Sequence, residues 1–267
     1  MDQYSRAYTL KGTVLSIVSI CLLAVQRLTD FTPSFSLGVL QAVIGGCLAN
    51  LFVVGINQLS DIKIDKGICL GWSVNSWPLK LSLLIWFGVG AAYSVNLPFL
   101  RWKRFPVLCT LCACSFQGVI LPLLFHLHAQ IHIHGRPLLL SKHAIFVFGI
   151  MSVYTTVLAV FKDIPDVEGD KINGINSFAS RFGPKRVFWI CVWLLEMVYA
   201  VAILTGISSA RFWIRLIMVT GHSILGFILW RNANLVDLNN KEAIESFYLF
   251  IWKLYCAEYL LVPFLRF

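Results

Sequence analysis

Apolar stretches long enough to cross a lipid bilayer recur from one end of the chain to the other. A transmembrane helix needs about 20 apolar residues, and such stretches lie at residues 10–28, 36–59, 79–98, 105–127, 143–161, 186–206, 212–230 and 247–266. With 58% hydrophobic and only 13% charged residues, the composition excludes an ordinary water-soluble domain. The polar stretches are too short for a second domain. The sequence therefore predicts one all-α membrane domain over residues 1–267, a bundle of about eight helices.

Residues 67–78 are apolar in part but too short to span the bilayer. A helix of this length rises only about 18 Å, against a hydrocarbon thickness of about 30 Å. Trp72, Trp77 and Pro78 lie in this segment, and tryptophan favours the headgroup boundary. We therefore expect an interfacial or re-entrant piece here.

Basic residues outnumber acidic ones, with 22 Lys and Arg against 13 Asp and Glu and a net charge of +9. They concentrate in the loops after the stretches 79–98, 143–161 and 212–230, which end on one face if successive helices alternate in direction. Such loops mark the cytosolic face, or the stromal face in a plastid, and suit anionic membrane lipid. They form no continuous basic stripe with interleaved aromatic residues, so nucleic acid is excluded as a partner.

Six of the 13 acidic residues fall in two short windows, at residues 57–65 and 162–170. In the first window Asn57, Asp61 and Asp65 are spaced i, i+4 and i+8, so they share one face if the preceding helix continues. The second window repeats this arrangement at i, i+3 and i+7, with Asp163, Asp166 and Asp170.

Two facing acidic walls suit a diphosphate held through Mg²⁺. This ion prefers oxygen ligands and usually takes one or two carboxylates together with water and phosphate oxygens. A cation such as Lys162, Lys103 or Arg101 would neutralise charge on a departing phosphate group. The alternative is that the aspartates are solvated charges at helix ends, although a cap needs only one acid.

The two windows, Asn-Gln-x-x-Asp-x-x-x-Asp and Lys-Asp-x-Pro-Asp-x-x-Gly-Asp, resemble the aspartate-rich motifs of the UbiA superfamily of intramembrane prenyltransferases. Residues 92–104, 161–171 and 186–206 are similar to the plant branch that acts on homogentisate, flavonoids and coumarins. The resemblance implies Mg²⁺-dependent transfer of a prenyl group from a prenyl diphosphate to an aromatic carbon of a phenol. It also implies a plastid membrane, although residues 1–11 show no transit peptide.

The resemblance also implies roles for individual residues. Asp61 and Asp65, oriented by Asn57, would hold one Mg²⁺ ion. A second ion would be held by Asp163 and Asp166, with Asp170. The residues expected to bind the diphosphate and ease its departure are Asn57, Lys162, Arg101 and Lys103. Tyr93 would hydrogen-bond the diphosphate or the acceptor, and Asp166 would take the phenolic proton.

The chain departs from the family after the first motif. The plant enzymes usually continue through a full further helix, whereas Asp65 here leads almost directly to residues 67–78, so about one of the family's nine helices is expected to be missing. Counting one crossing per helix then puts the two acidic windows on opposite faces of the membrane. Three explanations stay open: a re-entrant return at 67–78, a reversed helix at 36–59, or a shortened version of the chain, which we favour.

Two other functions compete with an active enzyme. A catalytically inactive, shortened isoform that associates with a complete enzyme would explain the missing helix. A transporter would explain acidic residues in a helical bundle, but transporters of that kind usually show two similar halves, and the first four apolar stretches do not repeat in the last four.

Overall fold

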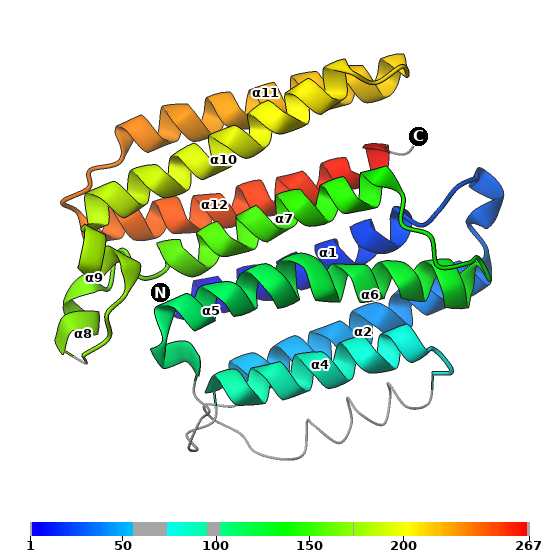
Figure 1. The fold of residues 1–267 in the computed structure, drawn as a ribbon, viewed down its shortest axis with the longest axis horizontal. Coiled ribbons are helices and arrows are strands. Elements are labelled where there is room, and N and C mark those ends of the chain that lie inside the picture. Colours follow the sequence, from blue (N-terminus) through cyan, green and yellow to red (C-terminus); the bar gives the residue numbers. More distant parts are fainter. Residues whose placement is uncertain (1, 56–73, 95–101, 173, 266–267) are drawn as a thin grey trace.

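The structure is a computed structural model that describes residues 2–55, 74–94, 102–172 and 174–265 (Figure 1). Of Lys103, and of residues 2–7, 54 and 55, only the backbone is described. The described residues therefore exclude the first acidic window, with Asn57, Asp61 and Asp65, and also exclude Arg101.

The described part of the chain contains eight long helices, which confirms the predicted all-α bundle. Their bounds are α1 Asp2–Leu22, α2 Pro33–Gly55, α4 Trp77–Ser94, the continuous rod Pro106–Ile133, α7 Lys142–Phe161, α10 Pro184–Ile207, α11 Phe212–Leu235 and α12 Lys241–Leu261. Short helices are η1 Leu28–Asp30, η2 Trp102–Arg104, α8 Val167–Ile172, α9 Phe178–Phe182 and η5 Val262–Leu265. Within the described ranges, six helices are long and apolar enough to cross a membrane. The other two long helices, α1 and α4, do not meet these criteria of length and apolar character.

The rod at Pro106–Ile133 is longer than the predicted stretch, which ended at residue 127. It consists of α5 Pro106–Cys112, the π-helical η3 Ala113–Ile120, α6 Leu121–Leu127 and the π-helical η4 His128–Ile133. In η3, a Cβ on Gly118 would lie 2.4 Å from the Cα of Ser152 in α7. Only glycine therefore allows η3 and α7 to pack this closely.

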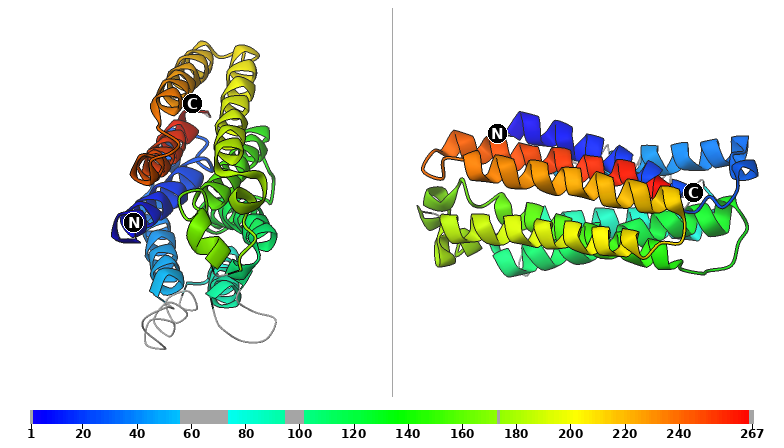
Figure 2. Two further views of the ribbon diagram at one scale, coloured as in Figure 1. Left: turned by 90° about the vertical axis from the view of Figure 1, so that its left-hand side faces the viewer. Right: turned by 90° about the horizontal axis from the view of Figure 1, so that it is seen from above.

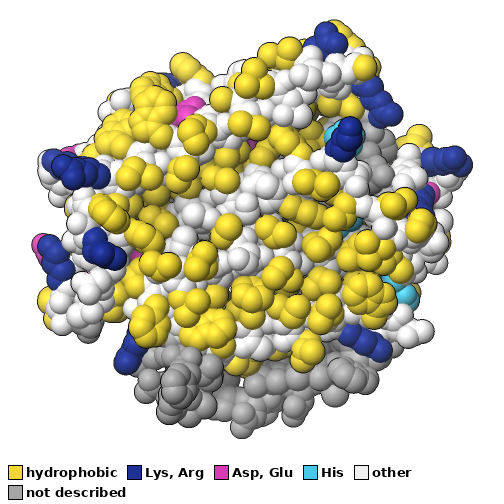
Figure 3. Space-filling model, in the orientation of Figure 1, with side chains coloured by type: hydrophobic (Ala, Val, Ile, Leu, Met, Phe, Trp, Pro, Cys, Tyr) yellow, Lys and Arg dark blue, Asp and Glu magenta, His cyan; other side chains and the backbone are white. Residues whose placement is uncertain are grey.

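The helices form a flattened bundle whose outer surface is apolar. The end-on view shows α10 and α11 at one edge, α2 and α4 at the other, and α1, α7 and α12 between them (Figure 2). α7 lies in the core, where Met151, Tyr154 and Val157 are fully buried. Apolar side chains cover much of the surface, and Lys and Arg side chains gather towards its ends (Figure 3). This distribution fits a protein surrounded by lipid, where helices satisfy their own backbone hydrogen bonds.

A buried polar pair joins α11 to α12. The Nε2 of His222 lies 2.9 Å from Oε1 of Glu258, and the His222 Nδ1 lies 2.7 Å from the carbonyl oxygen of Met218. The hydroxyl groups of Tyr154 and Tyr199 hydrogen-bond to each other nearby. These partners give His222 and Glu258, two ionisable residues within membrane spans, a packing role between helices.

The helices α2 and α4 run in the same direction. Ordered contacts show this: a Cβ on Gly45 would lie 3.1 Å from Leu83, and a Cβ on Gly90 would lie 2.3 Å from Val53. Residue numbers thus increase together along both helices, and both run towards the left in Figure 1. Successive helices in a simple up-and-down bundle are antiparallel. Since α2 and α4 are parallel, counting one membrane crossing per predicted helix gives the wrong direction for one of them.

The same end of the bundle therefore holds the ends of α2, α4 and α7. Tyr93, near the end of α4, contacts both Cys109 and Lys162, and Lys162 directly follows α7. The prediction that the helix before the first acidic window and the helix before the second one end on opposite faces is wrong. The connection between α2 and α4, where the re-entrant piece was expected, lies mostly outside the described residues, although Trp77 and Pro78 begin α4.

The parallel packing predicts a specific cross-link. A Cβ on residue 90 would lie 3.5 Å from the Cβ of Val53, within the range of about 3.5–4.5 Å found in disulfides. The double variant Val53→Cys, Gly90→Cys should therefore form a disulfide under mild oxidation, as measured by mass spectrometry of the linked peptides. The control pair Val53→Cys, Leu79→Cys, with its second cysteine at the start of α4, should stay unlinked. Linkage of the control pair in place of the first would mean that the helices are antiparallel.

Candidate active site

The second acidic window lies in a turn between two helices. α7 ends at Phe161, residues 162–166 form turns, and α8 begins at Val167. Pro165 has no backbone N–H to donate and so cannot continue the helix. The prediction that Asp163, Asp166 and Asp170 stack on one continuous helix is therefore wrong in its geometry.

The turn nevertheless brings the three carboxylates to one cavity, which we call the acidic cavity. Its volume is about 800 Å³. The side chains used below that line it are Tyr93, Arg104, Cys109, Lys162, Asp163, Asp166 and Asp170. Asp166 is exposed, whereas Asp170 is only 9% exposed and its Oδ2 has no hydrogen-bond partner among the described residues.

Lys162 is held between α4 and the acidic turn. Its Nζ donates a hydrogen bond to the hydroxyl oxygen of Tyr93 at 3.4 Å and lies 3.6 Å from Oδ1 of Asp163. The Tyr93 hydroxyl also lies 3.3 Å from the sulfur of Cys109. The result is a fixed cation at one wall of the acidic cavity.

The charges of this wall depend on one another. Burial raises the pKa of Asp163, Lys162 opposes that rise, and Asp170 and Asp166 add to it. Burial alone would lower the pKa of Lys162, but Tyr93, Cys109 and Asp163 together raise it above its ordinary value. Lys162 is therefore a cation at neutral pH, and the crowded carboxylates would be stabilised by a further cation.

A second, apolar cavity continues from the acidic cavity into the bundle, and we call it the apolar chamber. Its volume is about 290 Å³, and it shares Tyr93, Cys109 and Lys162 with the acidic cavity. Its walls come from α4, the rod, α7 and α12, and include Trp86, Phe116, Leu158, Tyr248 and Trp252. The site thus combines a charged opening, the acidic cavity, with an apolar interior, the apolar chamber.

The donor set of the acidic cavity fits Mg²⁺. Carboxylate oxygens are the ligands this ion prefers, and the buried Oδ2 of Asp170 lacks a partner in the described part of the chain. Within those same residues, no three His, Cys, Asp or Glu side chains are close enough to ligate one ion. One or two carboxylates, completed by water and phosphate oxygens, is the usual protein share for Mg²⁺. The assignment of Asp163, Asp166 and Asp170 as ligands stays a prediction.

Of the other residues expected at the site, the structure describes only some. Lys103 belongs to η2, next to Arg104, which lines the acidic cavity and was not expected there. Cys109 was also not predicted as a site residue, because a cysteine within an apolar run gives no sign that it lines a polar cavity. Tyr248 and Trp252 could have been anticipated, because two aromatic residues at i, i+4 on α12 form one face.

Comparison with known proteins gives a consistent result. The sequence pattern of the UbiA prenyltransferase family matches residues 66–254. Homogentisate phytyltransferase 1 of Arabidopsis thaliana is 47% identical over 99% of this chain and 74% of its own length. Naringenin 8-dimethylallyltransferase 2 of Sophora flavescens is 41% identical over 99% and 72%, and coumarin 8-geranyltransferase 1 of Citrus limon is 36% identical over 98% and 72%.

Solved structures share the fold. A UbiA homologue from Archaeoglobus fulgidus bound to Cd²⁺ aligns with a TM-score of 0.57 at 14% identity, over 96% of this chain and 97% of that one. A UbiA homologue from Archaeoglobus fulgidus bound to DMAPP and Mg²⁺ aligns with a TM-score of 0.51 at 16% identity, over 98% of this chain and 99% of that one. At such low identity the likeness establishes the fold alone.

Gly169 provides a test of the metal site. A Cβ on this residue would lie 2.7 Å from Oδ1 of Asp166, so Gly169→Ala must displace that carboxylate. We expect the affinity for Mn²⁺, used as a spectroscopic substitute for Mg²⁺ and measured by electron paramagnetic resonance, to fall by about 10-fold, as for other changes that move a ligand. The control Gly149→Ala, whose Cβ meets nothing within 4 Å, should leave Mn²⁺ affinity unchanged. Equal affinities of the two variants would remove Asp166 from the metal site.

Proposed function

Because this chain belongs to the UbiA prenyltransferase family, we propose that it transfers a prenyl group from a prenyl diphosphate to an aromatic carbon of a phenolic acceptor, with the help of Mg²⁺. The relatives named for homogentisate, naringenin and coumarin support an aromatic acceptor. The solved homologues bound to DMAPP or GPP with Mg²⁺ support the donor and the metal. All three of these relatives are named as chloroplastic, which supports a plastid membrane for this chain.

The observation that carries the proposal is the junction at Lys162. The acidic cavity and the apolar chamber meet at Tyr93, Cys109 and Lys162. A prenyl diphosphate has a charged head and an apolar tail, so its head fits the first space and its tail the second. Its reactive carbon would then lie at the junction, next to a fixed cation.

The chain's own side chains supply binding and charge stabilisation. Mg²⁺, when bound by the aspartates, neutralises the diphosphate. The ammonium of Lys162 and the hydroxyl of Tyr93 donate hydrogen bonds to the diphosphate oxygens as negative charge grows on them. The aromatic faces of Phe116, Tyr248 and Trp252 exclude water and stabilise positive charge on the prenyl carbon.

The transfer breaks one bond, forms one bond and releases one proton. The carbon–oxygen bond to the diphosphate breaks as a ring carbon of the phenol forms the new carbon–carbon bond. Asp166 accepts the phenolic proton during this attack. The ring-carbon proton then returns to the phenolate oxygen, which restores the aromatic ring. The proton on Asp166 leaves with the diphosphate through the acidic cavity.

A second candidate is an inactive, shortened isoform that associates with a complete enzyme. The alignments with the plant relatives run over 292 residues, whereas this chain has 267. The greater length of the alignments supports the expected loss of about one helix, which stays a prediction. A transporter, the third alternative, gains no support from the relatives.

A transfer assay separates the two candidates. The purified full chain in lipid nanodiscs is given dimethylallyl, geranyl, geranylgeranyl or phytyl diphosphate with a panel of phenols, and prenylated products are measured by mass spectrometry. The proposed enzyme gives at least one product, and EDTA abolishes it. If a folded chain gives no product with any pair, the inactive isoform is the better account.

Lys162 should contribute mainly to the chemical step. Lys162→Met keeps the length of the side chain but removes its charge, so kcat should fall by roughly 100-fold, the usual cost of removing one group that stabilises transition-state charge. KM for the donor should change far less. Lys171→Met, at an exposed position of α8 outside the acidic cavity, is the control and should retain normal kcat. Normal kcat in Lys162→Met would exclude Lys162 from the departure of the diphosphate.

A further inference from the structure

Two thiols that take no part in the proposed transfer lie next to each other on the rod. Cys109 and Cys112 are spaced i, i+3 on α5, so they share one face of the helix. Both are buried, yet both line the apolar chamber, and Cys109 lines the acidic cavity as well. In the described part of the chain both are free thiols. A Cys-x-x-Cys pair therefore lies at the junction of the two spaces.

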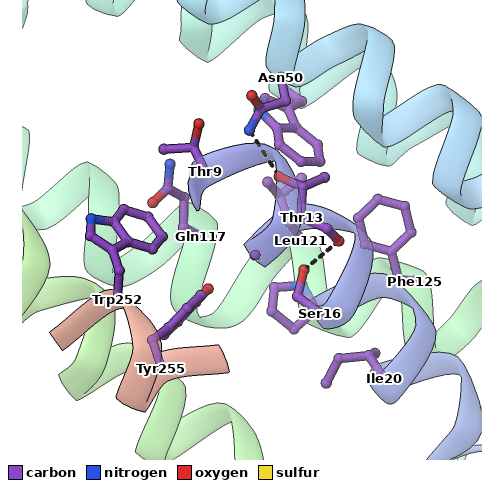
Figure 4. Close-up of a pocket in the computed structure, with 13 residues that line it drawn as sticks. Thr9, Thr13, Ser16, Ile20, Asn50, Gln117, Leu121, Phe125, Trp252 and Tyr255 are labelled. Atoms are coloured by element: carbon purple, nitrogen blue, oxygen red, sulfur yellow. Dashed lines mark hydrogen bonds between the residues drawn. The ribbon is translucent and has the colours of Figure 1, made fainter. Parts of the chain in front are cut away.

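The order of residues along the rod places this pair at the outer end of the chamber. Cys109 borders the acidic cavity, whereas Gln117 lines the chamber further along and also lines a third, small pocket. Figure 4 shows this small pocket, which has a volume of about 80 Å³ and also includes Thr13 and Asn50. Gln117 follows Cys109 by eight residues, a rise of at most about 12 Å at 1.5 Å per residue. A ligand that enters from the acidic cavity therefore passes the two thiols first.

Cys109 is the thiol better placed to react. Its sulfur lies 3.3 Å from the hydroxyl of Tyr93, which accepts a hydrogen bond from Lys162. A nearby ammonium stabilises a thiolate, and the thiolate is the form that attacks an oxidant. The acidic cavity, of about 800 Å³, gives small molecules from water a route to this sulfur.

Cys112 is placed to react second. Of the two spaces it lines only the apolar chamber, one helical turn further in than Cys109. The two thiols lie close enough to affect each other's charge. A reactive cysteine with a neighbouring second cysteine is the usual arrangement of a redox-sensitive pair.

A disulfide between these cysteines requires a small local closure. The Cβ atoms of positions i and i+3 on a helix lie about 5–6 Å apart, whereas a disulfide needs about 3.5–4.5 Å. The closure falls where α5 ends at Cys112 and the π-helical η3 begins at Ala113. There the backbone N–H of Ala113 is shared between the carbonyl oxygens of Cys109 and Thr110. A turn whose N–H already has two acceptors can tighten without leaving that donor unpaired.

A metal ion is the other ligand that a Cys-x-x-Cys pair can hold. Structural zinc takes four ligands. Among the residues that the structure describes, no third His, Cys, Asp or Glu is close enough to complete such a site with these two thiols. The pair therefore fits thiol oxidation better than metal binding.

We propose that Cys109 and Cys112 are a reversible modification site, at which a peroxide forms a disulfide that closes the passage from the acidic cavity to the apolar chamber. The thiolate of Cys109 attacks one oxygen of hydrogen peroxide and becomes a sulfenic acid, and the other oxygen leaves as hydroxide and takes up a proton. The thiol of Cys112 then attacks the sulfur of Cys109 and releases a second water. The two thiols lose two electrons and two protons, and the peroxide becomes two molecules of water.

The disulfide acts on transfer because it forms at the junction. Bringing the two Cβ atoms together shifts them by about 1 Å, and a misplacement of this size costs about 100-fold in rate. The same movement draws the sulfur of Cys109 away from the Tyr93 hydroxyl, which contacts Lys162. This effect on transfer rests on the proposed function, whereas formation of the disulfide does not.

The disulfide can be measured in the unmodified full chain in lipid nanodiscs. The chain is treated with hydrogen peroxide, the remaining thiols are alkylated, and the peptides are mapped by mass spectrometry. We expect a disulfide between Cys109 and Cys112 that dithiothreitol reverses, while Cys21 and Cys191, which are buried outside both cavities, stay reduced. A map in which Cys109 and Cys112 remain thiols, or pair with other cysteines, would overturn the proposal.

The effect of the disulfide is measured on the same oxidised sample. Prenyl transfer should fall by about 100-fold, as expected for a misplacement of about 1 Å, and should return with dithiothreitol, which does not reverse methionine oxidation. If the reduced chain gives no product, binding of labelled geranyl thiolodiphosphate with Mg²⁺ is measured instead, and the oxidised chain should lose it. A disulfide that changes neither transfer nor binding would overturn the closure.

Variants assign the two roles. Cys112→Ala lacks the second thiol, so Cys109 should persist as a sulfenic acid that dimedone traps. Cys114→Ala, at a position outside both cavities, is the matched control and should form the disulfide as the unmodified chain does. Equal trapping of Cys109 in Cys112→Ala and in the unmodified chain would remove Cys112 from the pair.

These results are distinguishable from a failure of the proposed function. A reversible disulfide in a chain that gives no prenylated product would reject the enzyme activity and keep the thiol pair. Transfer that peroxide leaves unchanged would keep the enzyme and reject the modification site.

Discussion

The ammonium of Lys162 links the two unlike halves of the site. It lies where the acidic cavity opens into the apolar chamber, 3.4 Å from the Tyr93 hydroxyl and 3.6 Å from Asp163. This position exists only because α4 and α7 end on the same side of the bundle. The close contact of η3 with α7 at Gly118 and the parallel packing of α2 with α4 at Gly90 make that arrangement possible. The chemistry therefore depends on the direction in which these helices run.

The apolar pattern predicted the existence of the helices well, because long apolar stretches in lipid have no alternative to a helix. α7 and α10 begin and end within two residues of the predicted bounds. The direction of α2 relative to α4 was predicted wrongly, since an apolar run has the same pattern whether its neighbour is parallel or antiparallel. The relevant information lies in contacts between distant residues, such as Gly90 with Val53.

For the second acidic window, the sequence predicted the residues but not their geometry. Its composition pointed to the correct group of residues, but a single helical phase was the wrong geometry because Pro165 ends the helix. The carboxylates reach one cavity through a turn instead. The small pocket lined by Thr13, Asn50 and Gln117 had no sequence signal, since these are isolated polar residues in apolar runs on three different helices. Only packing brings them together.

The central claim is that both acidic windows serve one diphosphate. It is tested most directly by counting Mn²⁺ ions bound per chain by electron paramagnetic resonance, in the presence of an unreactive geranyl thiolodiphosphate. We expect two ions in the unmodified chain and the loss of one ion in Asp61→Asn and of one in Asp163→Asn. A count that either substitution leaves unchanged would contradict a shared site.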